Sequence, residues 1–119
     1  MKTSVLSDKS FDFAIKVVKV CKYLNEEKKE NILSKQLLRS GTAIGALISE
    51  GRYAESKLDF IHKYGIAQKE CCETEYWIKL MFKCEYLSQK EYESLINDTT
   101  ELLKMLTASI LTAKKTLKK

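Results

Sequence analysis

The sequence predicts an all-α protein, an antiparallel up-down four-helix bundle in which residues 1–119 form a single domain. Apolar residues recur at three- and four-residue steps in four segments, which is typical of amphipathic helices. Proline is absent and only four glycines occur, so the residues that most often form turns are scarce. A chain of 119 residues has the usual size of one domain with one hydrophobic core. We expect this core to span residues 11–113, with a basic C-terminal end.

Residues 11–24 form the first predicted helix, and the polar residues 25–31 form the first turn. Short connections favour antiparallel neighbours. The apolar stripe of this helix comprises Phe13, Ala14, Val17, Val20, Cys21 and Leu24.

Residues 32–53 form the second predicted helix, which contains Gly41 and Gly45 within its periodic region. Each glycine inside a helix costs about 1 kcal/mol relative to alanine. Close approach of another helix backbone would explain them, and a break in the helix near Gly41 is the alternative. The expected stripe is Leu33, Leu37, Gly41, Ile44 and Ile48.

The third predicted helix begins at the N-cap Ser56, with Asp59 in its first turn, and reaches about Cys84. Its stripe is Phe60, Ile61, Tyr64, Ala67, Cys71, Thr74, Ile78 and Met81.

The fourth predicted helix follows Ser88, which forms a capping box with Glu91. Its stripe is Tyr92, Leu95, Ile96, Thr99, Leu102, Leu103, Leu106, Ile110 and Leu117.

Residues 1–9 contain no apolar signal region, and no run of about 18 apolar residues occurs, so we expect a soluble cytoplasmic protein.

The four cysteines lack C-x-x-C spacing, and we expect them to be buried or half-buried free thiols. A metal site is the alternative, because Cys71, Cys72 and His62 share one predicted helix. The full set of cysteines is Cys21, Cys71, Cys72 and Cys84.

Catalytic motifs are missing from the sequence. His62 is the single histidine, and no phosphate-binding loop or nucleophile elbow occurs. Glu70, Glu73 and Trp77 form a row on the third predicted helix, where the two carboxylates could act as acid and base or hold metals. The Glu-x-x-His motif of di-metal bundles is missing, however, and an ion pair with Arg39 is favoured. We therefore predict no catalytic residue, no cofactor and no metal site.

A formal net charge of +5 and a pI near 9.0 are compatible with a surface that binds polyanions. Lysine is also the default residue of soluble surfaces, so charge alone does not decide the question. The candidate contacts are Lys16, Lys19 and Lys22 in the first helix and Lys114, Lys115, Lys118 and Lys119 at the C-terminus.

Four blocks carry a family resemblance: residues 36–46, 57–61, 67–70 and 73–77. In these blocks, and over residues 11–106 as a whole, the sequence resembles the bacterial four-helix-bundle family named for intervening sequences in 23S ribosomal RNA genes. The resemblance implies a ring-shaped homopentamer without known enzymatic activity and with a nucleic-acid-binding role. A relative in fold is the accessory variability determinant of diversity-generating retroelements, a partner of a reverse transcriptase and its RNA. The resemblance further implies a structural or interfacial role for Arg39, Gly41, Gly45, Glu70 and Glu73.

We therefore expect a non-enzymatic homo-oligomer that binds RNA or DNA. The alternatives are a scaffold that binds another protein, such as a polymerase or reverse transcriptase, and an enzyme that uses Glu70 and Glu73. The large side chains of Tyr76, Trp77 and Phe82 exceed what one bundle readily covers. They predict a subunit interface on the third helix, unless Trp77 belongs to the core.

Overall fold

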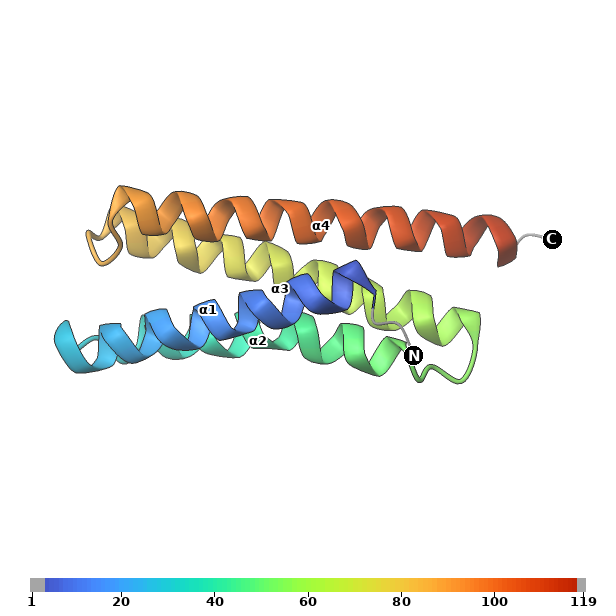
Figure 1. The fold of residues 1–119 in the computed structure, drawn as a ribbon, viewed down its shortest axis with the longest axis horizontal. Coiled ribbons are helices and arrows are strands. Elements are labelled where there is room, and N and C mark those ends of the chain that lie inside the picture. Colours follow the sequence, from blue (N-terminus) through green and yellow to red (C-terminus); the bar gives the residue numbers. More distant parts are fainter. Residues whose placement is uncertain (1–3, 118–119) are drawn as a thin grey trace.

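The computed structural model describes residues 4–117, and four helices account for nearly all of them (Figure 1). They are α1 (Val5–Glu27), α2 (Leu33–Gly51), α3 (Lys57–Lys83) and α4 (Gln89–Leu117). No strand occurs in this part of the chain. The predicted all-α four-helix bundle is therefore confirmed.

Consecutive helices run antiparallel and lie side by side, so the bundle has the up-down order α1, α2, α3, α4 (Figure 1). It is a rod with extents of 52 × 24 × 22 Å. The α1–α4 pair makes the least extensive of the four helix contacts. None of the described helices is apolar over enough of its length to cross a membrane.

The core consists of one row of side chains from each helix, as the sequence predicts. Fully buried members include Phe13, Val17 and Leu24 of α1 and, from the other helices, Leu37, Ile44, Ile48, Ile78, Met81, Leu95, Leu102 and Leu106. The prediction for Leu117 is wrong, because this side chain is exposed. It lies in the last turn of α4, which extends beyond the start of α1 (Figure 1).

Serine caps define three helix starts. At α3, the Ser56 hydroxyl accepts a hydrogen bond from the Asp59 N–H at 3.0 Å. At α4, the predicted capping box is confirmed. There the Glu91 N–H donates to the Ser88 hydroxyl at 3.1 Å, and the Ser88 N–H donates to the Glu91 carboxylate at 2.8 Å. The predicted start of the first helix is wrong, because α1 begins six residues earlier, with Ser4 as its cap.

Gly41 and Gly45, the two interior glycines of α2, lie against α1. α2 is continuous through Gly41, so the alternative of a break there is wrong. A Cβ atom at Gly41 would lie 3.0 Å from the side chain of Val17, and one at Gly45 would lie 3.3 Å from the backbone carbonyl oxygen of Ser10. Gly45 therefore lets the backbones of α1 and α2 approach closely.

Candidate nucleic-acid interface

The three lysines of α1 do not form one cationic row. The Lys16 ammonium lies 2.6 Å from an Asp98 carboxylate oxygen and 2.8 Å from the Ser94 hydroxyl, so it joins α1 to α4. Lys22 lies on the opposite flank of α1, in a shallow hollow shared with Leu38 of α2. Lys19 is exposed. Of the predicted α1 contacts, Lys16 is therefore already neutralised by a carboxylate within the chain.

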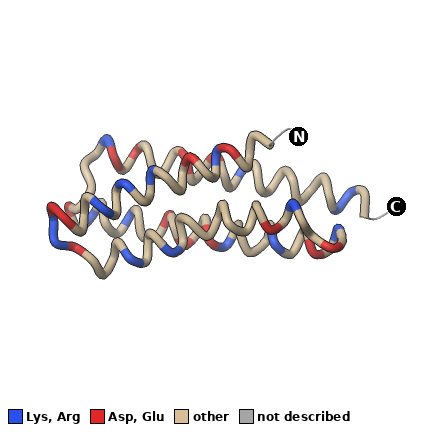
Figure 2. The backbone as a smooth tube through the Cα atoms, turned by 60° about the horizontal axis from the view of Figure 1, so that its bottom comes forward, with Lys and Arg blue, Asp and Glu red and all other residues tan. Residues whose placement is uncertain are grey.

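The C-terminal half of α4 carries the clearest excess of positive charge. Lys104, Lys114 and Lys115 are exposed and make no ion pair within the described residues. No Asp or Glu follows Glu101 in the sequence. Figure 2 shows positive and negative residues mixed along most of the bundle, but only positive ones in the last turns of α4. This segment is the candidate interface.

The surplus charge is concentrated at the chain ends. Lys2, Lys118 and Lys119 lie outside the described residues, and without them residues 4–117 have a net charge of +2. Lys118 and Lys119 are predicted contacts whose positions are therefore not described. Because α1 and α4 are antiparallel, Lys22 and Lys115 lie toward opposite ends of the rod (Figure 1). One subunit does not bring the two predicted lysine groups together.

Arg39 joins α2 to α3 through two carboxylates. One of its terminal nitrogens lies 3.4 Å from both Glu70 carboxylate oxygens, and the other contacts Glu73. The Trp77 indole N–H also donates to Glu73, at 3.1 Å. The hydrogen bond from Arg39, followed by that from Trp77, lowers the pKa of Glu73, and the same bond raises the pKa of Arg39. Glu73 is thus held as an acceptor, which suits a structural ion pair better than acid catalysis.

The large aromatic residues of α3 are mostly accommodated within the subunit. Phe82 is half-buried and stacks on Tyr92, with ring centroids 4.2 Å apart. Trp77 is half-buried against the core, whereas Tyr76 is 59% exposed. A subunit interface on α3 would therefore have only Tyr76 as a strongly exposed aromatic anchor.

A longer apolar surface lies over α1 and α2 instead. Phe11 is 67% exposed, Ile15 41%, Val18 48% and Leu38 of α2 38%, and we call these four residues the α1–α2 strip. Beside Phe11, a hollow of about 540 Å³ extends between the helices to Gly45. The sequence contains a signal for it, because residues 11, 15 and 18 follow helical spacing next to the core stripe.

The cysteines are divided between the core and the surface. Cys21 and Cys71 are buried, and burial raises the pKa of Cys21 to about 11 and that of Cys71 to about 12, so both stay protonated thiols at neutral pH. Cys72 and Cys84 are exposed, and for them the prediction of burial is wrong. His62 is also exposed. Among residues 4–117, no three His, Cys, Asp or Glu side chains are arranged to hold a metal ion.

These features define a small helical bundle with paired surface charges, a basic C-terminal helix and an uncovered apolar strip. The chain belongs to the 23S rRNA-intervening sequence protein family, whose model matches residues 2–108. It is also similar to the crystal structure of a protein of unknown function from the S23 ribosomal protein family of Bacteroides thetaiotaomicron. The two share 50% sequence identity with a TM-score of 0.88, over 89% of this chain and 98% of the other. No curated protein matches the sequence significantly.

Proposed function

We propose that this protein is a non-enzymatic homo-oligomer that binds nucleic acid through the C-terminal half of α4. One observation carries the proposal: from Leu102 to Lys119 the chain contains five lysines and no acidic residue. Within the described part, the lysines of this segment are exposed and unpaired by carboxylates. Such groups can release counterions from a phosphate backbone, which is the main source of sequence-independent affinity.

Self-association would make this modest charge effective. The α1–α2 strip is an apolar surface of the kind that marks protein contacts, and it has no equally apolar counterpart on α3. A contact between two different faces repeats from subunit to subunit and can close into a ring. We propose five subunits, in keeping with the homopentamer that the family resemblance implies. The ring would present one basic α4 segment per subunit, so a polyanion could bind several at once.

A salt titration of RNA and DNA binding tests the nucleic-acid part. The affinity should fall steeply as salt increases, and the triple variant Lys104→Gln, Lys114→Gln, Lys115→Gln should show a shallower slope because fewer counterions are released. The matched control is Lys63→Gln, Lys79→Gln, which removes lysines that already pair with Glu50 and Glu75. Absence of binding by the unaltered protein at low salt would refute the proposal.

Light scattering tests the assembly. We expect a mass that is a multiple of 13.7 kDa, and five times that value for the ring. Phe11→Ser should reduce the mass, while Tyr76→Ser on the opposite side tests an α3 interface. A monomer at micromolar concentration would rule out the ring, and loss of assembly in Tyr76→Ser alone would place the interface on α3.

A scaffold for another protein is the second candidate. The net charge of only +2 on residues 4–117 favours it, because most of this surface has balanced signs. A polymerase or reverse transcriptase is the partner class that we would test. Co-purification that survives nuclease treatment would support the scaffold, whereas its loss after nuclease treatment would favour nucleic acid.

A further inference from the structure

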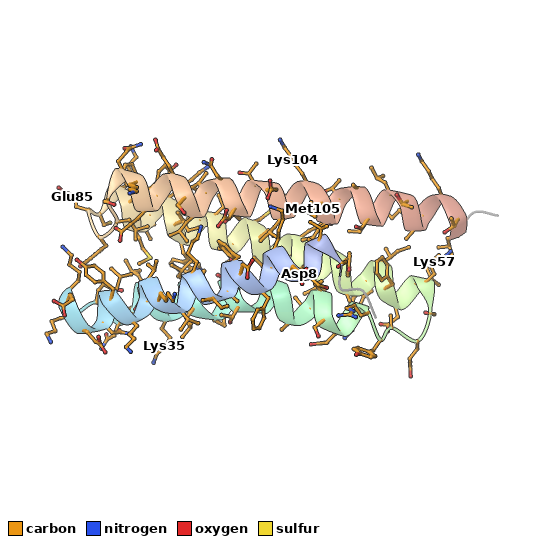
Figure 3. The ribbon with its side chains drawn as sticks, viewed as in Figure 1. Asp8, Lys35, Lys57, Glu85, Lys104 and Met105 are labelled. Carbon is orange, nitrogen blue, oxygen red and sulfur yellow. The ribbon has the colours of Figure 1, made fainter. Side chains whose placement is uncertain are left out.

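The end of α4 has no α1 residues opposite it. Lys9 of α1 forms an ion pair with Glu101 of α4, and the two helices are antiparallel, so the start of α1 at Val5 lies about one turn further along α4. Figure 3 shows Asp8 and Met105 in the same part of the bundle. The last ten residues of α4 therefore extend roughly 15 Å past α1, at 1.5 Å per residue. Among the described helices, α3 is the remaining neighbour on this stretch (Figure 1).

A shallow groove occupies the side that α1 leaves open. It has a volume of about 440 Å³ and lies between the end of α4 and the beginning of α3. Among the described residues that line the groove, Phe60 of α3 is the one aromatic residue, and Ser109, Thr112 and Thr116 of α4 carry hydroxyl groups. The Phe60 ring packs against Tyr64 with centroids 4.1 Å apart. This contact holds the ring in place at the edge of the core while it still lines the groove.

Two lysines lie beside this groove. The Lys57 ammonium donates a hydrogen bond to the Thr116 hydroxyl, which places one positive charge at its rim. Lys57 lies at the same end of the bundle as the C-terminal turns of α4 (Figure 3). Lys115 immediately precedes Thr116 and is exposed. The nearby carboxylate of Asp59 accepts the Glu55 backbone N–H at 3.2 Å, within the turn that precedes α3.

We propose that this groove binds a base of a single-stranded nucleic acid, with the base against Phe60. Aromatic side chains beside cationic ones are the common means of binding single strands, because every base has a face that can stack. The hydroxyls of Ser109 and Thr112 can bond to base edges or sugars, whereas that of Thr116 already donates to the Ala113 carbonyl at 2.9 Å. Lys57 and Lys115 can contact the flanking phosphates. A duplex keeps its base faces stacked on one another and cannot offer one to Phe60. This inference rests on the proposed function and narrows it to single strands.

Fluorescence anisotropy with the full-length protein tests it, using a short unstructured RNA and a hairpin duplex of the same composition. Phe60→Leu removes the ring but keeps an apolar side chain. We expect it to weaken single-strand binding by about 5- to 150-fold, the effect of losing one stacked base. Its salt slope should stay unchanged, because no phosphate contact is lost. The matched control is Phe82→Leu. Phe82 lies in α3, as Phe60 does, and its half-buried ring stacks on Tyr92 of α4. This variant should bind as the unaltered protein does.

The possible outcomes separate this inference from the function on which it rests. If Phe60→Leu binds the single strand normally while the triple lysine variant binds weakly, the groove is wrong and the proposed function stands. If the unaltered protein binds no nucleic acid, both are wrong. Should Phe60→Leu fail to fold, photo-crosslinking of the unaltered protein to 4-thiouridine RNA decides. Adducts in the peptides that contain Phe60 or residues 108–116 support the groove, and adducts confined to other peptides overturn it.

Discussion

Glu30 and Ser34 form two hydrogen bonds with each other at the start of α2. The Glu30 carboxylate accepts the Ser34 backbone N–H at 2.8 Å, and the Ser34 hydroxyl donates to the Glu30 carbonyl at 2.9 Å. The same carboxylate accepts the N–H groups of Ile32 and Leu33, at 3.0 and 2.9 Å. α2 has no side-chain cap at its formal N-cap position, so Glu30 supplies the acceptor that its first turn lacks.

This arrangement predicts a loss of stability in acid. Burial works against the charge on Glu30, but the backbone donors outweigh it and lower the pKa below the ordinary 4.5. A group with a lowered folded pKa stabilises the protein above its unfolded pKa, and this contribution is lost as the pH falls through the folded value. Glu30→Gln should therefore reduce the free energy of unfolding at pH 7 by about 0.5–2 kcal/mol, as for a lost helix cap.

Denaturant titrations between pH 7 and pH 3 measure this effect. The difference between Glu30→Gln and the unaltered protein should begin to shrink near pH 4.5, where the unfolded carboxylate takes up a proton, and should be lost as the pH falls through the lower pKa of the native carboxylate. Glu27→Gln, which changes an exposed glutamate at the end of α1, is the control. A difference that stays constant across this range would show that the charge of Glu30 does not matter.

Two helices end with a non-glycine residue in the left-handed region. Lys29 has φ 55° and Glu85 has φ 67°, and in each case the next residue donates its N–H back to the preceding helix. Glycine is the usual residue at such a position, because it has no Cβ. Lys29→Gly and Glu85→Gly should each raise the free energy of unfolding by about 0.5–1 kcal/mol. Lys28→Gly should not raise the free energy of unfolding, because Lys28 has φ −101°. A gain in stability in this variant would refute the explanation by backbone conformation.

The coupling free energy between Arg39 and Glu73 should be small but measurable. Both side chains are more than a third exposed, so a double-mutant cycle with Arg39→Gln and Glu73→Gln should give less than about 1 kcal/mol. The Trp77 indole bonds to Glu73, and Trp77 is the only tryptophan, so its fluorescence reports on this pair directly. Additive losses, with emission unchanged in Arg39→Gln, would show that the pair does not act as a unit.

Local chemistry explains which helix boundaries could be predicted. The capping box of Ser88 and Glu91 is readable because both partners lie three residues apart in the sequence. Periodicity does not reveal the start of α1, because residues 7–10 are polar and interrupt the apolar stripe. The Ser10 side chain is nevertheless buried, and its hydroxyl donates to the Ser7 carbonyl at 2.9 Å. A serine that bonds to its own helix can thus occupy a core position, which hydrophobic periodicity does not reveal.

The candidate site was predictable only in part, since charge pairing depends on distant residues. The sequence predicts that Arg39 meets Glu70 and Glu73, and the structure brings the three side chains together. The sequence offers Lys16 as a candidate contact for a polyanion, but it pairs with Asp98, which lies 82 residues away in the sequence. No local pattern shows that antiparallel packing places α4 beside it. The groove at Phe60 likewise depends on how far α4 extends past α1, which follows from the register of the two helices.

The last prediction compares two glycines that lie in helix interiors. A Cβ atom at Gly45 would lie 3.3 Å from the Ser10 carbonyl oxygen, whereas one at Gly65 would have no atom within 4 Å. Gly45→Leu should lower the free energy of unfolding by about 1–3 kcal/mol, because the α1 backbone must move. Gly65→Ala should raise it by up to about 1 kcal/mol, since alanine favours the helix and meets no obstacle.

For these two variants, denaturant unfolding measures the effect on the stability of the fold, and light scattering measures the effect on the assembly of subunits. An unchanged stability of Gly45→Leu would show that the backbones of α1 and α2 can separate without cost. For Gly65→Ala, greater stability with unchanged mass means that the position is free in the oligomer as well. Greater stability with a smaller mass would mean that the open space beside Gly65 receives a neighbouring subunit. That outcome would place part of the interface on α3, opposite the α1–α2 strip, as a head-to-tail ring requires.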